Sequence, residues 1–215
     1  MVASSNREKA ALRREPLLKR AFDFTLAFLG LILSSPLWLV FSLAIYLEDQ
    51  GPILFFQERC GRGARPFQII KFRTMRHKGD DRNLVIDVEN DPRNTKVGSL
   101  LRMAAMDELP SLINILKGDM SFVGPRPLPF KINVREGVHY DNITQIPGYH
   151  LRSQVKPGLT GIAQIYAPKN LDHSSKFQYD SLYVDRMSIW LDLKLILLSL
   201  WITLRGRWEY REGKV

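Results

Sequence analysis

Two adjacent carboxylates, Asp107 and Glu108, stand in a sequence context that suits phosphate chemistry. Pro110 follows them and predicts a short helix up to Leu116, which Gly118 would end. Near a helix N-terminus, the positive end of the helix dipole stabilises carboxylates and phosphates alike. An ionised aspartate there can act as a nucleophile or bind a divalent cation, although an acidic residue in that place is more often a plain helix cap.

Basic residues of an expected strand can supply the matching positive charge. Residues 53–57 and 67–75 predict two short strands that are joined by a turn. Alternation places Lys71 and Arg73 on the same face of the second strand. Two cations on one face are well placed to hold a phosphate, and a solvated strand edge would show the same pattern.

Two rigid loops carry further cations. Arg126 stands between two prolines, which restrict the backbone and so can aim a guanidinium at phosphate oxygens. Lys156 directly precedes the turn 157–161 and is a second loop cation suited to a phosphate. Each segment is also explained as an ordinary loop.

A long apolar segment near the N-terminus indicates a membrane helix. Residues 24–47 contain no charged side chain and exceed the roughly 20 residues that a helix needs to span a bilayer. Pro36 lacks a backbone N–H, so a kink or break is expected there, and the hydroxyl of Ser34 or Ser35 can bond the freed carbonyl. A buried helix of a soluble protein and a kinked helix that spans the bilayer are the alternatives.

Charge on the two sides of this segment favours a re-entrant helix. Arg13, Arg14, Lys19 and Arg20 stand before the segment, and such residues mark a cytoplasmic side. Lys and Arg also outnumber Asp and Glu after the segment, which favours the same side. A helix that enters the membrane and returns at Ser35-Pro36 satisfies both flanks, so we expect a hairpin rather than a full span.

A second apolar stretch, residues 187–204, lies near the C-terminus. Asp192 and Lys194 interrupt it, and the uncharged remainder is too short to span a bilayer. Its tryptophans and the arginines that follow them are typical of the lipid headgroup region. We expect an amphipathic interfacial helix, and an ordinary core helix is the alternative.

The overall composition narrows the class of protein. The 215 residues carry a formal net charge of +9 and are 45% hydrophobic, which suits one domain with a core and excludes a disordered chain. The single cysteine, Cys60, excludes a disulfide framework, and the four histidines show no zinc-ligand spacing. The positive balance favours an anionic partner. No helix-turn-helix or base-stacking motif is evident, so we expect no nucleic-acid partner.

The order of these motifs resembles the bacterial sugar transferase family, the monotopic phosphoglycosyl transferases. The matching motifs are, in chain order, Lys19-Arg20-Ala21-Phe22-Asp23, Ser35-Pro36, Lys71-Phe72-Arg73-Thr74-Met75, Asp107-Glu108-Leu109-Pro110, Val123-Gly124-Pro125-Arg126-Pro127, Pro157-Gly158-Leu159-Thr160-Gly161 and Leu191-Asp192-Leu193-Lys194. The resemblance implies transfer of a sugar-1-phosphate from a UDP-sugar to undecaprenyl phosphate. UMP would leave, and the undecaprenyl-diphosphate-sugar product would begin polysaccharide or glycoconjugate synthesis.

The resemblance also implies roles for individual residues. Asp107 would form a covalent phosphosugar intermediate, and Glu108 would help to bind Mg²⁺ or to position the acceptor, so both carboxylates are expected metal ligands. The cations expected to neutralise the substrate phosphates are Lys71, Arg73, Arg102 and Arg126. Pro36 would break the re-entrant helix. Residues 104–106 and 162–164 depart from the family pattern, which bears on sugar preference or packing and removes no charged group.

The expected architecture is therefore α+β. It comprises an N-terminal tail (1–16), a re-entrant membrane helix (17–49) and a small mixed catalytic domain with short strands and an interfacial helix (50–215), held on the cytoplasmic face of the bacterial inner membrane. The sugar and the oligomeric state, including a homo-oligomer, stay open, as does whether the chain is a minimal form or part of a longer protein. The rival functions are a membrane-anchored nucleic-acid binder, a phosphohydrolase and a catalytically silent assembly factor.

Overall fold

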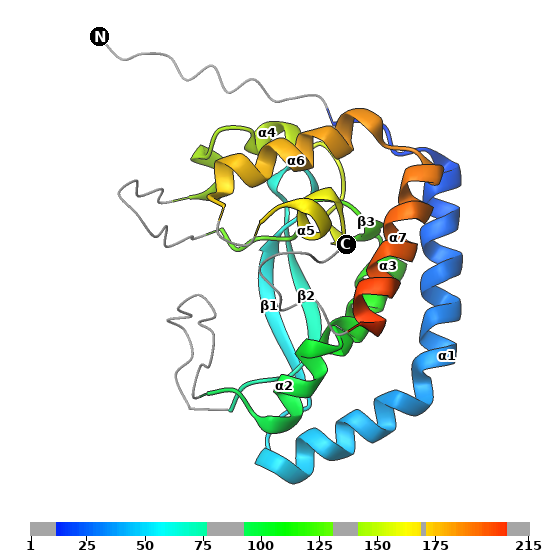
Figure 1. The fold of residues 1–215 in the computed structure, drawn as a ribbon, viewed down its shortest axis with the longest axis vertical. Helices are drawn as coiled ribbons and strands as arrows, with labels where there is room; N and C mark the ends of the chain where they lie inside the picture. Colours follow the sequence, from blue (N-terminus) through cyan, green and yellow to red (C-terminus); the bar gives the residue numbers. More distant parts are fainter. Residues whose placement is uncertain (1–11, 77–92, 131–141, 169–170, 206–215) are drawn as a thin grey trace.

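The computed structural model describes residues 12–76, 93–130, 142–168 and 171–205, in which helices surround two small sheets (Figure 1). The elements run in the order α1 (Leu17–Asp49), β1 (Leu54–Cys60), η1 (Arg62–Ala64), β2 (Pro66–Phe72), α2 (Lys96–Met103), η2 (Met106–Ser111), α3 (Leu112–Lys117), β3 (Ser121–Val123), η3 (Ile143–Gln145), α4 (Tyr149–Arg152), β4 (Gly158–Thr160), α5 (Ile162–Tyr166), α6 (His173–Arg186) and α7 (Ile189–Leu204). This mixture of helices and strands confirms the expected fold class.

Helix α1 is bent in its middle, where Pro36 lies (Figure 1). Proline has no N–H to offer the carbonyl one turn earlier, and here the hydroxyl of Ser35 donates instead to the oxygen of Ile32, at 2.8 Å. The helix therefore continues through Pro36 as a kinked helix, which is one of the two forms expected at this residue. By length and composition, α1 could cross a membrane.

Both halves of α1 pack against the rest of the protein. In the N-terminal half, Ala27 is fully buried in a cluster with Leu112 and Ile115 of α3. In the C-terminal half, Ile45 is buried with Phe72 of β2 and Leu101 of α2. The two ends of the apolar helix are thus fixed to one body.

Strands β1 and β2 form an antiparallel hairpin at the centre of the fold. Phe55 pairs with Lys71, and Arg59 pairs with Phe67. The strands are shifted from the expected 53–57 and 67–75, because the turn between them begins later, after Cys60, and because β2 ends at Phe72. The polar segment 77–94, whose composition predicts a loop, lies almost wholly outside the described residues.

Strands β3 and β4 form a short parallel pair, and glycines beside them allow the two backbone segments to approach closely. A Cβ on Gly158 would lie 2.1 Å from the backbone nitrogen of Gly124, which no larger residue can accommodate without backbone movement. Hydrogen bonds continue the pairing past β3, from Gly124 N to Thr160 O at 2.9 Å and from Gly158 N to Pro125 O at 3.0 Å. The pair therefore fixes the chain that leads into Arg126.

A buried polar cluster joins α1, α6 and α7. The ammonium of Lys19 lies 2.6 Å from Asp192 Oδ2 and 3.8 Å from Asp23 Oδ2. Tyr183 of α6 donates its hydroxyl to Asp192 Oδ1, at 2.8 Å. Because these groups are almost completely buried, they can be accommodated only as partners of one another.

Helix α7 has two different apolar faces. One face, with Leu195 and Ile202, is buried in the core. The other carries Trp190, 81% exposed, and Leu204, 83% exposed. The helix therefore contributes to the core and also presents apolar side chains outward, and the interfacial interpretation of this stretch stays a prediction. Trp208 and the arginines after residue 205 lie outside the described residues.

Candidate active site

The acid pair lies in η2, the 3-10 helix between α2 and α3. Asp107 and Glu108 occupy the first turn of this element, so the structure corrects the expectation that they precede the helix. The chain turns sharply at Ala105, whose φ of 51° is in the left-handed region. Because a left-handed alanine interrupts a right-handed helix, α2 ends and η2 starts in a new direction at this residue.

Side chains of the segment that follows the acid pair bind the free edge of β2. Asn114 accepts the N–H of Ile70 at 3.0 Å and donates to the carbonyl of Gln68 at 2.7 Å, as a neighbouring strand would. Ser111 donates to the carbonyl of Ile70 at 2.7 Å. These three bonds fix the acid pair against the strand that carries Lys71.

Three of the predicted cations converge on the acid pair. The ammonium of Lys71 lies 2.5 Å from Glu108 Oε1, and a guanidinium nitrogen of Arg126 lies 3.6 Å from the same oxygen. Arg102 donates to Thr74 Oγ1 at 3.1 Å and to Asn94 Oδ1 at 2.7 Å, and its charge acts on Asp107. The structure therefore brings together residues from β2, α2, η2 and the loop after β3.

The two carboxylates have different electrostatic environments. Burial raises the pKa of Asp107 to about 6, and the charge of Glu108 adds to this shift, whereas Lys71 and Arg126 oppose it. Burial also acts to raise the pKa of Glu108, but Lys71 and Arg126 outweigh it and hold that pKa well below its usual value. Glu108 is thus ionised at any physiological pH, and Asp107 is the more basic carboxylate of the two.

Arg59 is a site residue that the sequence interpretation missed. A small cavity of about 30 Å³ is lined by Arg59, Ile69, Lys71, Glu108, Met120, Arg126, Pro127 and Gly158. Burial, together with the neighbouring Arg126, lowers the pKa of Arg59 to about 10. Strand alternation puts Arg59 and Gln57 on one face of β1. Only the hairpin register shows that Lys71 of β2 lies on the same face of the sheet.

Two predicted phosphate ligands lie in other ion pairs. Arg73 follows the end of β2, and its guanidinium lies 3.1 Å from Asp49 Oδ2 at the end of α1. Lys156 lies 2.7 Å from Glu15 Oε2, just before α1 begins. Both side chains connect residues near the two ends of α1 to the rest of the fold, and neither lines the cavity beside Glu108.

The donor set fits a Mg²⁺ ion that is shared with substrate phosphates. The described residues hold no group of three or more His, Cys, Asp or Glu that could enclose a metal. Magnesium, however, is usually bound by one or two carboxylates together with substrate phosphates. Asp107 and Glu108 can supply those carboxylates, although Lys71 already engages Glu108 Oε1.

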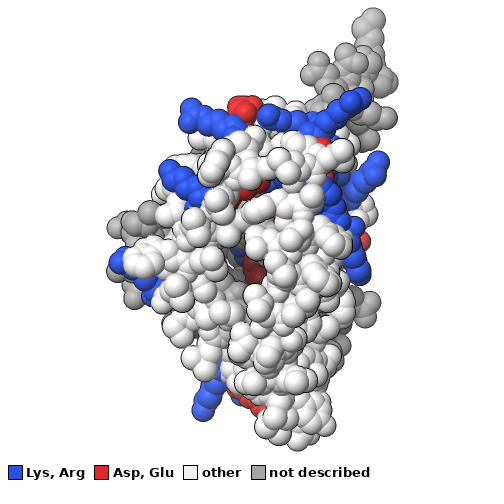
Figure 2. Space-filling view, turned by 90° about the vertical axis from the view of Figure 1, so that its right-hand side faces the viewer, with Lys and Arg blue, Asp and Glu red and all other residues white. Residues whose placement is uncertain are grey.

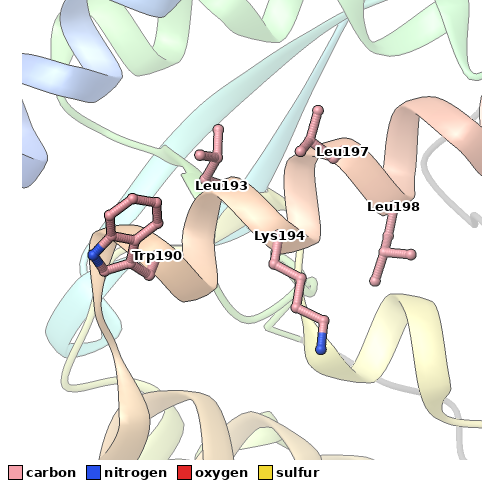
Figure 3. Close-up of a pocket in the computed structure, with 5 residues that line it drawn as sticks. All are labelled: Trp190, Leu193, Lys194, Leu197 and Leu198. Carbon is pink, nitrogen blue, oxygen red and sulfur yellow. The ribbon is translucent and has the colours of Figure 1, made fainter.

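Apolar side chains are exposed on α1 and α7. Figure 2 shows the face over α1 as largely uncharged, with Lys and Arg gathered toward its upper end. Leu33 and Leu39 of α1 are 79% and 77% exposed on this helix. A groove of about 370 Å³ on α7 is lined by Trp190, Leu193, Lys194, Leu197 and Leu198 (Figure 3). Apolar surface of this extent is typical of contact with a membrane or another macromolecule.

Fold and site together define a protein with an apolar, kinked N-terminal helix and a carboxylate pair enclosed by cations, an arrangement suited to binding phosphate groups. The chain belongs to the bacterial sugar transferase family, whose sequence profile matches residues 14–206. This membership confirms the resemblance inferred from the motifs.

Curated relatives include enzymes that act on different sugars. The chain is 41% identical over 189 residues to the UDP-glucose:undecaprenyl-phosphate glucose-1-phosphate transferase of Escherichia coli K12, covering 85% of this chain and 39% of that protein. It is 36% identical over 193 residues to a UDP-N-acetylgalactosamine-undecaprenyl-phosphate N-acetylgalactosaminephosphotransferase of Aeromonas hydrophila, covering 88% of this chain and 44% of the relative. The chain thus spans about two fifths of the length of these relatives.

A relative of similar size is the exopolysaccharide production protein PSS of Rhizobium leguminosarum. It is 39% identical over 186 residues, which cover 83% of this chain and 91% of that protein.

Proposed function

We propose that this protein transfers a sugar-1-phosphate from a UDP-sugar to undecaprenyl phosphate and releases UMP. The observation that carries the proposal is the enclosure of Asp107 and Glu108 by the cations Lys71, Arg102 and Arg126, with Arg59 beside them. Four cations against two carboxylates leave a positive site, as a diphosphate substrate requires. The activities for which the curated relatives are named support this reaction class.

Asp107 is the proposed nucleophile. Its carboxylate attacks the sugar-bearing phosphorus of the UDP-sugar, the bond from that phosphorus to the bridging oxygen breaks, and UMP leaves with the electron pair. A phosphate oxygen of undecaprenyl phosphate then attacks the aspartyl-phosphosugar and regenerates the carboxylate. The raised pKa of Asp107 supports this role, because a more basic carboxylate is a better nucleophile while still ionised at neutral pH.

The remaining groups bind and orient the phosphates. Lys71 and Arg126 flank Glu108 and neutralise charge that accumulates on the transferred phosphoryl group, which is the main requirement of phosphoryl transfer. Asp107 and Glu108 would hold Mg²⁺, which supplies further charge neutralisation when bound. The cavity of about 30 Å³ accommodates no more than a small group, so the nucleoside and the sugar would lie outside it.

Helix α1 would hold the site at the membrane in which the lipid acceptor lies. Both ends of α1 contact the catalytic body: Arg20 donates to Ile115 O at 2.6 Å, and Glu48 accepts the N–H of Lys96 at 2.7 Å. A helix held at both ends by one body supports a re-entrant arrangement that enters and leaves the membrane on the cytoplasmic side. The outward face of α7 would lie at the headgroup level.

Release of UMP from UDP-sugars is the decisive assay. The purified protein in detergent with Mg²⁺ is given UDP-glucose, UDP-N-acetylgalactosamine or another UDP-sugar, with and without undecaprenyl phosphate. We expect repeated turnover, with many UMP molecules released per enzyme, for at least one sugar and only when the lipid is present; without lipid, release should stop at no more than one UMP per enzyme. Release that is independent of lipid would instead indicate a phosphohydrolase, and no release from any sugar would favour an assembly factor.

A further inference from the structure

We propose that Arg152 is a positioning residue that sets the direction of Arg126 through its backbone. The proposal rests on the proposed function, in which Arg126 binds a substrate phosphate. Arg152 is the last residue of α4, is 5% exposed and belongs to none of the motifs that carry the family resemblance.

Arg152 links the loop of Arg126 to α6. One guanidinium nitrogen, Nη2, donates to the carbonyl oxygen of Arg126 at 2.6 Å. Nε donates to Asp180 Oδ2 at 2.8 Å, and the guanidinium lies over the ring of Phe177, 4.5 Å from its centroid. Asp180 and Phe177 are both buried in α6. Helix α6 therefore fixes the guanidinium of Arg152, and this guanidinium in turn fixes the backbone at Arg126.

The Arg126 side chain needs support from its backbone, because few contacts restrain the side chain itself. It is 56% exposed, and the ionic partner that the described residues offer it, Glu108, is 3.6 Å away. Backbone carbonyls on both sides of it are engaged: that of Pro125 by Gly158 N at 3.0 Å and that of Leu128 by Cys60 N at 2.8 Å. The carbonyl of Arg126 lies between these two along the chain, and without Arg152 it would lose its hydrogen-bond donor.

Only arginine fits these two tasks at once. The planar guanidinium has N–H groups on separate nitrogens in a fixed fork, so it can bind Asp180 and the Arg126 carbonyl together. A lysine could neutralise Asp180 but would hold the carbonyl less firmly. The Asp180 carboxylate also neutralises the charge of the buried Arg152 guanidinium.

A double-mutant cycle tests whether Arg152 acts through Arg126. In the otherwise unaltered protein, Arg152→Lys should lower kcat/KM for the UDP-sugar roughly tenfold, which corresponds to about 1.4 kcal/mol. In an Arg126→Ala background, the same change should lower kcat/KM less than twofold, because the group it positions is gone. A general loss of structure would be equally harmful in both backgrounds.

A buried control separates stability from positioning. Ile202→Val shortens a fully buried side chain of α7 and should lower the temperature of thermal unfolding by a few degrees. Its small effect on kcat/KM should be the same with and without Arg126→Ala. Asp180→Asn, which loosens the anchor of Arg152, should instead show the dependence on Arg126 that Arg152→Lys shows.

Binding of inorganic pyrophosphate, followed by calorimetry, completes the test without turnover. We expect Arg152→Lys to weaken pyrophosphate binding severalfold when Arg126 is present and not when it is alanine. Equal losses in the two backgrounds, no loss at all, or no pyrophosphate binding by the unaltered protein would overturn the proposal. Because this measurement needs neither a UDP-sugar nor a lipid, its result stands even if the UMP-release assay contradicts the proposed function.

Discussion

Lys71 and Glu108 form an ion pair of 2.5 Å that joins the central hairpin to the 3-10 helix η2. The pair holds one carboxylate of the acid pair in its charged form, while burial raises the pKa of the adjacent Asp107. Two neighbouring carboxylates thereby acquire different pKa values. This pattern is expected when one carboxylate reacts and the other helps to bind a substrate or metal.

Replacing Asp107 tests the nucleophile. Asp107→Asn should abolish UMP release, because an amide cannot form the phosphosugar bond, and loss of a nucleophile costs several orders of magnitude in rate. Thermal unfolding and membrane association should remain near normal. Mass spectrometry of the wild type, quenched with UDP-sugar and without lipid, should find a phosphosugar on Asp107. Near-native turnover of the variant, or an adduct on another residue, would exclude the mechanism.

The rate should fall on the acid side as Asp107 becomes protonated. The nucleophile must be ionised, and burial raises its pKa to about 6, so kcat/KM should decline tenfold per pH unit below about pH 6 and level off above it. Arg102→Gln removes a charge that lowers this pKa, so the decline should begin at a higher pH. A profile centred near pH 4, or one that Arg102→Gln leaves unmoved, would disagree with this assignment.

Arg126→Lys distinguishes a phosphate ligand from a loop anchor. A guanidinium can bind two phosphate oxygens at once and an ammonium cannot, so we expect a loss of roughly tenfold or more in kcat/KM. Arg186→Lys, at an exposed position at the end of α6, is the matched control and should be neutral. An Arg126→Lys enzyme within twofold of wild type in both kcat and KM would show that Arg126 is not a phosphate clamp.

Pro36→Ala tests the bend in α1. Alanine restores the backbone N–H that can bond the carbonyl oxygen of Ile32. Because proline in a helix interior lowers helix stability by about 3 kcal/mol, its removal should favour a straight helix. A straight helix would draw the catalytic body away from the lipid, and activity should fall. The topology is tested in a protein that keeps Pro36 and has Cys60 replaced. Single cysteines introduced in place of Arg14 and of Arg186 should be labelled from the same side of the membrane. Labelling from opposite sides would indicate a full span.

Lys19→Met should destabilise the fold strongly. It leaves Asp192, which is fully buried, without its ionic partner, and breaking such a pair costs about 3–5 kcal/mol. Thermal unfolding in detergent should shift down by roughly 10 °C. Adding Asp192→Leu should recover part of the loss, since an apolar pair needs no charge partner. Lys117→Met, at an exposed position on α3, should change stability by less than about 1 kcal/mol.

Local features of this protein could be predicted from its sequence because they depend on neighbours in the chain. The uncharged run around Pro36 predicted a long apolar helix with a defect in its middle, and the defect appears as a kink relieved by Ser35. Gly118 ends α3 with a φ of 92°, a conformation that glycine adopts without strain. Motif order was enough to identify the family.

Contacts between distant segments required the tertiary structure. Lys71 and Arg73 share a strand pattern, yet the strand ends between them, so Lys71 meets Glu108 while Arg73 meets Asp49. Arg59 joins the site only through the hairpin register, which the irregular turn at residues 61–65 sets. Arg152 meets Arg126 because α4 and α6 pack together. Local propensity determined which segments are helix or strand, whereas long-range packing decided which charges became neighbours.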